Sequence, residues 1–367
     1  MQRRSFLKKA GLGAVAGSAA VAAPAIAQSN PTVNWKLTST YGPSTPALFS
    51  TAQLFCKMVE EASDGNFKIR LYPAGEIVPG FGVMDAVSNG TVECGQTASY
   101  YYYGLDPSYS FDTAVPFGLN ARQMNAWMLE GNGMKLMREL FAKRNIINFP
   151  FGNTGTQMGG WYRKEINSVE DLKGLKMRTA GFAGEVLARM GVVPQQVPPG
   201  DIYPSLEKGT LDAVEFVGPV DDERLGFQKV AKYYYYPGWW EGSAQVSLYF
   251  NDAAFNGLPK QYQSIIEVAS RAAGDRLLTQ YDAESPAALR RLIASGAVLK
   301  AFPRDVMDAA FQTSNVVYKE FCDKDPGFKK IYDDYMGFRD AIVPWFRVAE
   351  NSYDNYLGIA LANARRG

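Results

Sequence analysis

The feature that most constrains the fold of this chain is a regular succession of strand-like and helix-like patterns. Residues 33–38 and 67–72 alternate apolar and polar side chains, as half-buried strands do. Between them, residues 48–62 place apolar side chains at every third or fourth position, which is typical of an amphipathic helix. A helix over 83–89 and a strand over 92–96 follow. Strands that alternate with helices form mostly parallel sheets covered by helices, so the pattern predicts an α/β fold.

The middle of the chain repeats this succession. Residues 175–178 and 211–215 have strand patterns, and two helical segments, 183–190 and 203–208, lie between them. A chain of 367 residues exceeds the size that one hydrophobic core usually supports, so we expect two α/β lobes with a cleft between them. We expect residues 28–150 to form mainly the first lobe, 151–250 mainly the second, and 251–367 the crossing strands and a helical C-terminal tail.

The N-terminal segment has the pattern of an export signal. Arg3 and Arg4 form a twin-arginine pair, an uncharged Ala/Gly-rich run extends over 10–23, and Ala25-Ile26-Ala27 is a small-residue cleavage site. The alternative is a membrane anchor, but the run is shorter than the ~20 residues that a stable span needs. We therefore expect residues 1–27 to be a Tat signal peptide and the mature protein to be periplasmic.

The composition excludes several classes of function. The chain contains no histidine, so it can hold no Ser-His-Asp triad, no Cys-His pair and no His-ligated zinc. Removal of residues 1–27, which carry four basic and no acidic residues, changes the formal charge from +1 to −3, so we expect no nucleic-acid partner. The three cysteines, Cys56, Cys94 and Cys322, match no metal or redox spacing; they are either small buried residues or include one disulfide pair.

Six strings along the chain carry a family resemblance. They are GNFKI at 65–69, AGEIVPG at 74–80, NTGTQMGGW at 153–161, GLKMR at 174–178, GDIYPSLEKGT at 200–210 and YYYYPGWWEG at 233–242. Together they resemble the substrate-binding subunits of tripartite ATP-independent periplasmic (TRAP) transporters, and most closely the branch that binds 2-oxo acids such as pyruvate. The likeness extends from about Val33 almost to the C-terminus. It implies a two-lobe periplasmic binding protein that traps its ligand in the cleft and delivers it to integral membrane subunits.

Arg178 is the first candidate for ligand binding. It ends a strand just before Gly181, and sheets of this class bind ligands at the carboxyl ends of their strands. The planar guanidinium matches a carboxylate with two parallel hydrogen bonds. From its residue type alone, Arg178 could equally be a surface arginine paired with an acid. The resemblance implies that an arginine at this motif position binds the substrate carboxylate.

A second set of residues indicates a bound cation. Gln157, Glu215 and Glu241 are oxygen donors in apolar or aromatic surroundings, and two buried carboxylates beside an anionic ligand would repel it unless a cation lay between them. Na⁺ and Ca²⁺ accept such oxygen ligands. The resemblance implies that these residues, with the backbone carbonyl of Phe216, hold a metal that also contacts the substrate. A tryptophan is typical at the position of Phe216, and an ordinary buried ion pair is the alternative for the two glutamates.

Further candidates come from polar and aromatic runs. Residues 100–103 are four consecutive tyrosines, which cannot all point in one direction, and we expect Tyr100 and Tyr101 to contact the ligand. Tyrosine runs also serve packing, which is the alternative here. Asn153 is a weaker candidate of the same kind.

The C-terminal segment 341–361 carries more apolar side chains than one solvent-facing helix needs. It either pairs two protomers into a homodimer or packs back on its own lobes. Taken together, these patterns predict a non-enzymatic receptor for a small 2-oxo or 2-hydroxy monocarboxylate. A secreted glycosidase-like enzyme that uses two carboxylates and an extracytoplasmic sensor subunit are the alternatives.

Overall fold

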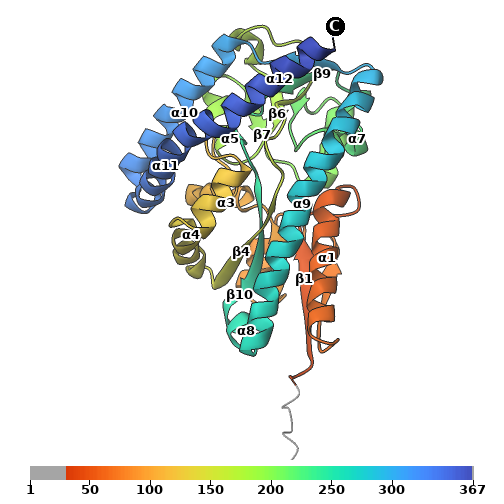
Figure 1. Ribbon diagram of the computed structural model, residues 1–367, viewed down its shortest axis with the longest axis vertical. Helices are drawn as coiled ribbons and strands as arrows, with labels where there is room; N and C mark the ends of the chain where they lie inside the picture. The colour runs from red at the N-terminus through yellow and green to blue at the C-terminus, as the bar shows by residue number, and fades with distance from the viewer. Residues whose placement is uncertain (1–29, 366–367) are drawn as a thin grey trace, which may run out of the picture. The chain divides into compact units, whose positions relative to one another are not determined.

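The computed structural model describes residues 30–365 (Figure 1). The predicted signal peptide, residues 1–27, lies outside the described residues. No helix between residues 30 and 365 is both long enough and apolar enough to cross a membrane. Cys56, Cys94 and Cys322 are all free thiols, so the expected alternative of a disulfide pair is not found.

Five strands form the first sheet, in the order β2-β1-β3-β10-β4. β1 is parallel to β2 and β3, whereas β10 is antiparallel to both β3 and β4. The pattern at the start of the chain therefore predicted the parallel part of this sheet, and the antiparallel pair β10–β4 was not anticipated. The strands are β1 (Val33–Ser39), β2 (Phe67–Tyr72), β3 (Cys94–Thr97), β4 (Ile146–Asn153) and β10 (Gln245–Asn251), and the first helices are α1 (Pro46–Ala62) and α2 (Val83–Ser88).

Six strands form the second sheet, in the order β11-β9-β5-β8-β6-β7. β6 is parallel to its neighbours β7 and β8, and β5 is antiparallel to β8 and β9. The strands are β5 (Gly160–Tyr162), β6 (Lys176–Arg178), β7 (Val193–Gln195), β8 (Ala213–Val214), β9 (Tyr233–Tyr236) and β11 (Val298–Ala301). Among the helices that connect them are α5 (Gly181–Arg189), α6 (Pro199–Glu207) and α7 (Pro219–Leu225).

One long helix, α9 (Lys260–Ala294), contacts α1 and β4, which belong to the first half of the fold (Figure 1). It also contacts α7, a helix that connects strands of the second sheet. Its 35 residues correspond to a length of about 52 Å at 1.5 Å per residue. Buried Tyr262, Ile266, Ala269, Ala273 and Leu277 recur at three- and four-residue spacing along one face of this helix. The mixed α/β architecture with a helical C-terminal region confirms the predicted fold class.

The C-terminal region is built from α10 (Arg304–Lys324), α11 (Pro326–Phe346), a π-helical turn over Arg347–Asn351, and α12 (Ser352–Ala364). α11 continues through Pro344 to Phe346. α11 packs on α10, whereas α12 buries none of its side chains.

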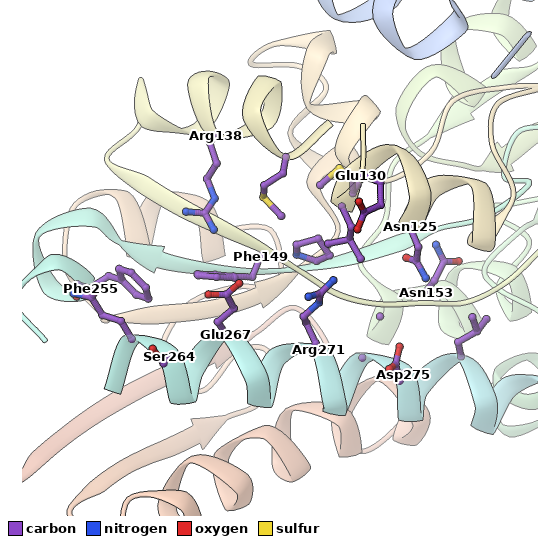
Figure 2. A pocket seen from close by; sticks show the side chains of 18 of the residues that line it. Asn125, Glu130, Arg138, Phe149, Asn153, Phe255, Ser264, Glu267, Arg271 and Asp275 are labelled. Carbon is purple, nitrogen blue, oxygen red and sulfur yellow. The ribbon is translucent and has the colours of Figure 1, made fainter. Parts of the chain in front are cut away.

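A groove separates α3 (Ala121–Leu129) and α4 (Gly133–Ala142) from α9, and β4 forms its floor (Figure 2). It has a volume of about 680 Å³. Neither α3 nor α4 was predicted from the sequence. Because the groove is lined by charged as well as apolar side chains, it is distinct in character from the two buried cores.

Candidate functional site

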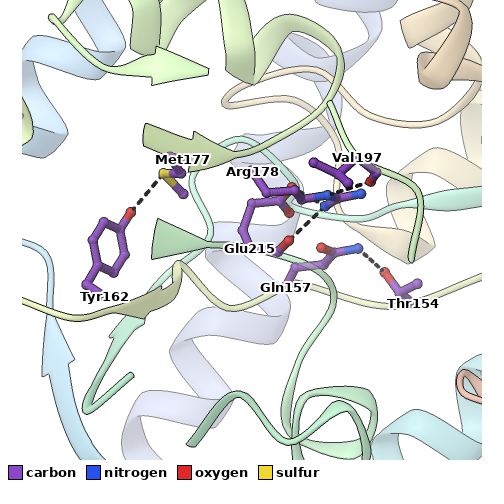
Figure 3. Close-up of polar contacts among 7 residues, drawn as sticks. All are labelled: Thr154, Gln157, Tyr162, Met177, Arg178, Val197 and Glu215. Atoms are coloured by element: carbon purple, nitrogen blue, oxygen red, sulfur yellow. Dashed lines mark hydrogen bonds and ion pairs between the residues drawn. The ribbon is translucent and has the colours of Figure 1, made fainter. Parts of the chain in front are cut away.

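The carboxyl ends of two parallel strands bring Arg178 and Glu215 together. Arg178 is the last residue of β6 and is paired with Val214 of β8, and Glu215 follows directly. Arg178 Nη1 donates hydrogen bonds to the Glu215 carboxylate and to the Glu215 backbone oxygen, the latter at 2.7 Å (Figure 3). Both side chains are 0% exposed, so Arg178 is not a surface arginine. Its Nε also donates to the backbone oxygen of Val197 at 3.4 Å, which fixes the plane of the guanidinium.

Two loops place Gln157 and Glu241 beside this pair. The backbone N–H of Gln157 donates to the backbone oxygen of Glu241 at 3.1 Å. The backbone N–H of Gly238 donates to the backbone oxygen of Gln157 at 2.9 Å. The next residue, Met158, donates its N–H to the Val217 oxygen at 3.0 Å. These bonds join the loop after β4, the loop after β8 and the loop after β9. Gln157 and Glu241, which are 84 positions apart in the sequence, therefore lie together.

Several buried polar atoms at this point have no hydrogen-bond partner among the described residues. The Gln157 amide donates through Nε2 to Thr154 Oγ1 at 3.1 Å, which leaves Oε1 unpaired (Figure 3). Burial of such groups without partners costs on the order of 1–3 kcal/mol each, and more for charged groups. The unpaired atoms are Gln157 Oε1, Glu215 Oε2, both carboxylate oxygens of Glu241, and Arg178 Nη2.

These unpaired atoms fit a hard cation together with an anion. Four oxygens from two carboxylates and one amide are the ligands that Na⁺ and Ca²⁺ prefer, and backbone carbonyls complete such shells. The free N–H group on Arg178 Nη2 suits a carboxylate. No cluster of three or more His, Cys, Asp or Glu side chains suited to a metal occurs within residues 30–365, so a cation here would depend on the amide and on carbonyls as well as the two glutamates.

The electrostatics of the three charged groups agree with this interpretation. Burial raises the pKa of Glu241 well above its usual value, and the adjacent Glu215 carboxylate raises it further. Burial also raises the pKa of Glu215, although Arg178 lowers it in part. Burial acts to lower the pKa of Arg178, but Glu215, Tyr101, Tyr100 and Glu241 together outweigh it and the net shift is upward. Without a cation the raised pKa of Glu241 favours its protonated form, and a bound cation would favour the carboxylate form.

Aromatic side chains close the site. Tyr100 and Tyr101 belong to the 3₁₀ helix Ser99–Tyr102 that follows β3, and their ring centroids are 4.8 Å apart. The Tyr100 ring packs on Gly181, where a Cβ atom would lie 2.9 Å from Cδ2 and where φ is +59°. The glycine thus allows Tyr100 to approach the start of α5 next to Arg178.

A small cavity of about 10 Å³ lies against these groups. It is lined by Tyr100, Tyr101 and Gln157 among the predicted residues, and the Phe216 ring at its wall lies 5.5 Å from the Arg178 guanidinium. The sequence interpretation missed several other lining residues. Tyr41 could have been found, because it follows the carboxyl end of β1 and the strand-end rule that selected Arg178 applies there too. The lining residues that were missed are Tyr41, Leu48, Ala98, Thr154, Val217, Ala244, Gln245 and Val246.

Behind the cavity, Asp112 connects three elements and was also missed. Gln245 Nε2 donates to the Asp112 backbone oxygen at 2.9 Å, and Asn148 Nδ2 donates to Asp112 Oδ1 at 3.0 Å. Ser99 and Ser247 donate their hydroxyls to Asp112 Oδ2. Asp112 thus holds the tyrosine-bearing 3₁₀ helix against β4 and β10. No sequence motif surrounds it, so only the contacts reveal its role.

Asn153 lies apart from the other candidates. It is 1% exposed, accepts a hydrogen bond from Gly155 N–H at 2.9 Å, and lines the groove beside α9 rather than the small cavity (Figure 2). Its amide Nδ2 is buried and has no partner among the described residues. The structure therefore brings Arg178, Gln157, Glu215, Phe216, Glu241, Tyr100 and Tyr101 together and places the Asn153 side chain elsewhere.

Comparison with known proteins gives this arrangement a context. A monocarboxylate 2-oxoacid-binding periplasmic protein of Nostoc sp. is 48% identical over 326 residues, which are 89% of each chain. A TRAP transporter solute-binding protein of Bordetella bronchiseptica is 52% identical, with a TM-score of 0.90 over 91% of this chain and 100% of that one. It forms a mixed-occupancy dimer in which copurified calcium and picolinate occupy one active site and the other is apo.

Two further solved structures contain pyruvate. TRAP solute-binding proteins from Colwellia psychrerythraea and Pseudoalteromonas atlantica are each 40% identical to this chain, with TM-scores of 0.86. They cover 89% and 88% of this chain, and 99% of each of those chains is covered. The first has bound calcium and pyruvate, and the second has bound sodium and pyruvate.

The family follows from a match over most of the chain. Residues 38–325 match the model of the bacterial extracellular solute-binding proteins of family 7, DctP. This confirms the resemblance inferred from the motifs, and it assigns the chain to solute receptors of transporters rather than to enzymes. The chain therefore belongs to family 7 of the bacterial extracellular solute-binding proteins, among the solute receptors of TRAP transporters.

Proposed function

We propose that this protein captures a small 2-oxo monocarboxylate, such as pyruvate, together with a Na⁺ or Ca²⁺ ion, and delivers it to the membrane subunits of a TRAP transporter. The observation that carries the proposal is the group of unpaired buried atoms on Arg178, Gln157, Glu215 and Glu241 beside one small cavity. The relatives with bound pyruvate and calcium or sodium support both the substrate class and the cation.

Each residue has a role that follows from its position. Arg178 is held by Glu215 and Val197, so its free Nη2 is oriented before a substrate carboxylate arrives. Gln157, Glu215 and Glu241 would hold the cation through side-chain oxygens, and the Phe216 carbonyl would add a backbone oxygen. When bound, the cation supplies the positive charge that offsets the two carboxylates and so permits an anionic substrate to bind. Tyr100 and Tyr101 would exclude water from the ligand, since both rings are buried.

The lining of the small cavity indicates which substrates suit the site. Leu48, Ala98, Val217, Ala244 and Val246 give it an apolar wall. An oxo or hydroxy group next to the carboxylate would reach the cation, and a short aliphatic remainder would face this wall. We therefore propose 2-oxo acids with short side chains, and 2-hydroxy acids of the same size, as the ligands.

Export and assembly are part of the proposal. The periplasmic relatives support a periplasmic location, and residues 1–27 would direct export by the Tat route. On the C-terminal helices Val343, Trp345, Val348, Tyr353 and Tyr356 are between 44% and 75% exposed, which is unusual for large apolar side chains. We propose that this surface pairs two protomers, as the dimer of the Bordetella bronchiseptica relative also suggests.

Calorimetric titration tests the proposal. Mature protein is treated exhaustively with chelator in sodium-free buffer and then titrated with pyruvate, first without added ion and then with Ca²⁺ or Na⁺. We expect tight binding only when the ion is present, and a titration with the ion should be tighter when pyruvate is present, because the coupling between two ligands is reciprocal. Full-affinity pyruvate binding without the ion would show that the two glutamates are structural.

A further inference from the structure

The groove between α4 and α9 contains a charged side chain that the proposed function does not use. Arg138 projects from α4 toward β4, and its guanidinium lies over the Phe149 ring at 4.4 Å from the centroid (Figure 2). Within residues 30–365 it forms no hydrogen bond and no ion pair, and its Nε is buried. Burial lowers the pKa of Arg138 to about 10, although the more distant charges of Glu267 and Asp112 offset this in part. Arg138 is half-buried and its Nε is shielded from water, so an anion in the groove would supply the partner that this guanidinium lacks.

The other charges in the groove do not supply this partner. Lys260, Glu267, Arg271 and Asp275 are all exposed on α9, and Glu130 is exposed at the end of α3. Glu267, Arg271 and Asp275 follow one another at four-residue spacing, so opposite charges on α9 are neighbours and compensate each other in solvent. Arg138 is thus the one groove cation among the described residues that is half-buried rather than exposed.

The rest of the lining is apolar. Phe149, Phe255, Met128, Met134 and Leu278 contribute side chains from five elements around the volume of about 680 Å³. That volume is in the range of pockets for organic ligands of moderate size and is far larger than the small cavity beside Arg178.

The groove also has a second unpaired donor. Asn153 Nδ2 is buried and unpartnered, and Figure 2 shows this side chain at the end of the groove opposite Phe255. Phe149 and Asn153 are four positions apart on β4, which corresponds to about 13 Å along a strand. The groove is therefore elongated, with a buried donor near each end and an apolar lining between them.

We propose that this groove is a second ligand site, separate from the Arg178 site, which binds a carboxylate with an apolar chain of moderate length. The carboxylate pairs with Arg138, and the chain lies along β4 against Phe149, Met134 and Leu278. The ligand needs no oxo or hydroxy group next to its carboxylate, because no cation ligands gather here. The inference does not depend on the identity of the substrate at the Arg178 site.

Octanoate is a suitable probe, because it has one carboxylate and a flexible apolar chain but lacks the 2-oxo group. The mature protein is first saturated with pyruvate and Ca²⁺, and octanoate is then titrated by calorimetry, with acetate as a chain-free comparison. We expect octanoate to bind with one site per chain and acetate to bind far more weakly. We expect Arg138→Met to weaken octanoate binding roughly tenfold or more, since it removes a charged hydrogen-bonding group.

Two controls separate a local effect from a general one. Lys135→Met removes a cation from the exposed side of α4 outside the groove, and it should leave the octanoate affinity unchanged. Met134→Trp fills part of the groove without altering charge, and it should also abolish octanoate binding. All three variants should keep the pyruvate affinity of the unmodified protein, which shows that they are folded.

Three results would overturn the proposal. The first is that octanoate does not bind to the pyruvate-saturated protein. The second is that both Arg138→Met and Met134→Trp bind octanoate with unchanged affinity. The third is that pyruvate displaces bound octanoate in a competition experiment. The last result would place octanoate in the Arg178 site. A failure of pyruvate itself to bind would contradict the proposed function and would leave the octanoate measurement on the unliganded protein as the test of the groove.

Discussion

Replacement of Glu241 by glutamine should stabilise the ligand-free protein and at the same time weaken ligand binding. Glu241 is 2% exposed, neither of its carboxylate oxygens has a hydrogen-bond partner among the described residues, and the Glu215 charge is close enough to raise its pKa. Glutamine has nearly the same shape and no charge. The substitution therefore removes the cost of either burying the Glu241 charge beside Glu215 or protonating the group at neutral pH, while it also removes a proposed ligand of the cation.

The expected magnitudes differ in sign and size. Glutamine is still a polar group, so the gain comes only from the lost charge; it is worth about 1–3 kcal/mol, which corresponds to a rise of roughly 2–4 °C in Tm for each kcal/mol in a protein of this size or somewhat smaller. Loss of a charged group from a buried, complementary contact costs about 2–5 kcal/mol of binding free energy, or roughly a 30- to 5,000-fold weaker Kd. The net effect is a protein that is more stable without ligand and that gains less stability from it.

Thermal denaturation and calorimetry measure the two effects on the same samples. Chelated Glu241→Gln should unfold at a higher temperature than the chelated unmodified protein, and addition of Ca²⁺ with pyruvate should raise its Tm much less. Glu76→Gln is the matched control, because Glu76 is exposed and should change neither quantity. A lower Tm for the chelated variant would refute the reasoning, since it would mean that the Glu241 carboxylate makes favourable contacts in the ligand-free protein.

Four further outcomes are expected. Arg178→Lys keeps the charge but loses the second guanidinium nitrogen, so titration should show pyruvate binding weaker by about 2–4 kcal/mol; an unchanged Kd would remove Arg178 from the site. Burial raises the pKa of Asp112 to about 6 from 3.8, so the native state binds this proton more tightly and the free energy of unfolding should fall by about 2 kcal/mol as pH rises from 4 to 6. Urea denaturation of Asp112→Asn should show a correspondingly flatter pH dependence, and an equal slope would contradict the shift. Replacement of Arg3 and Arg4 by lysine should retain the precursor in the cytoplasm, as cell fractionation would reveal, whereas normal export would exclude the Tat route. Light scattering of the mature protein at micromolar concentration should report a dimer that Trp345→Glu dissociates; a monomer for the unmodified protein would end that proposal.

The position of Arg178 and Glu215 illustrates what local sequence patterns determine. Both follow short apolar strand patterns, and parallel neighbouring strands end at the same edge of a sheet. The pairing of β6 with β8 therefore follows from the strand–helix alternation, and the proximity of the two side chains follows from the pairing. Gln157 and Glu241 are different, because both lie in loops whose approach depends on backbone hydrogen bonds between distant segments. Only the family motif indicated them in the sequence.

The antiparallel pairing of β10 with β3 and β4 could not be predicted either, because it also joins segments that are distant in the sequence. β10 pairs with β3 and β4, which lie about 100–150 positions earlier in the chain. Its residues are almost all buried, so the alternation that marks a half-exposed strand is absent. Asn153 shows the consequence for the site. Successive side chains of a strand point to opposite sides, and only the pairing of β4 with β10 determines that Asn153 faces the groove.

The sequence by itself determined the α/β class, the exclusion of histidine-dependent chemistry, and the residue types that suit a carboxylate and a hard cation. These properties depend on composition and on short-range periodicity, which each segment carries with it. The tertiary structure alone decided which charges find partners. Arg178 meets Glu215 across two adjacent strands, whereas Arg138, an equally ordinary arginine in the sequence, lies on an aromatic ring in a groove without a carboxylate in contact. The physical reason is that the free energy of a buried charge depends on the groups within a few ångströms of it, and those groups come from segments that the chain brings together only when it folds.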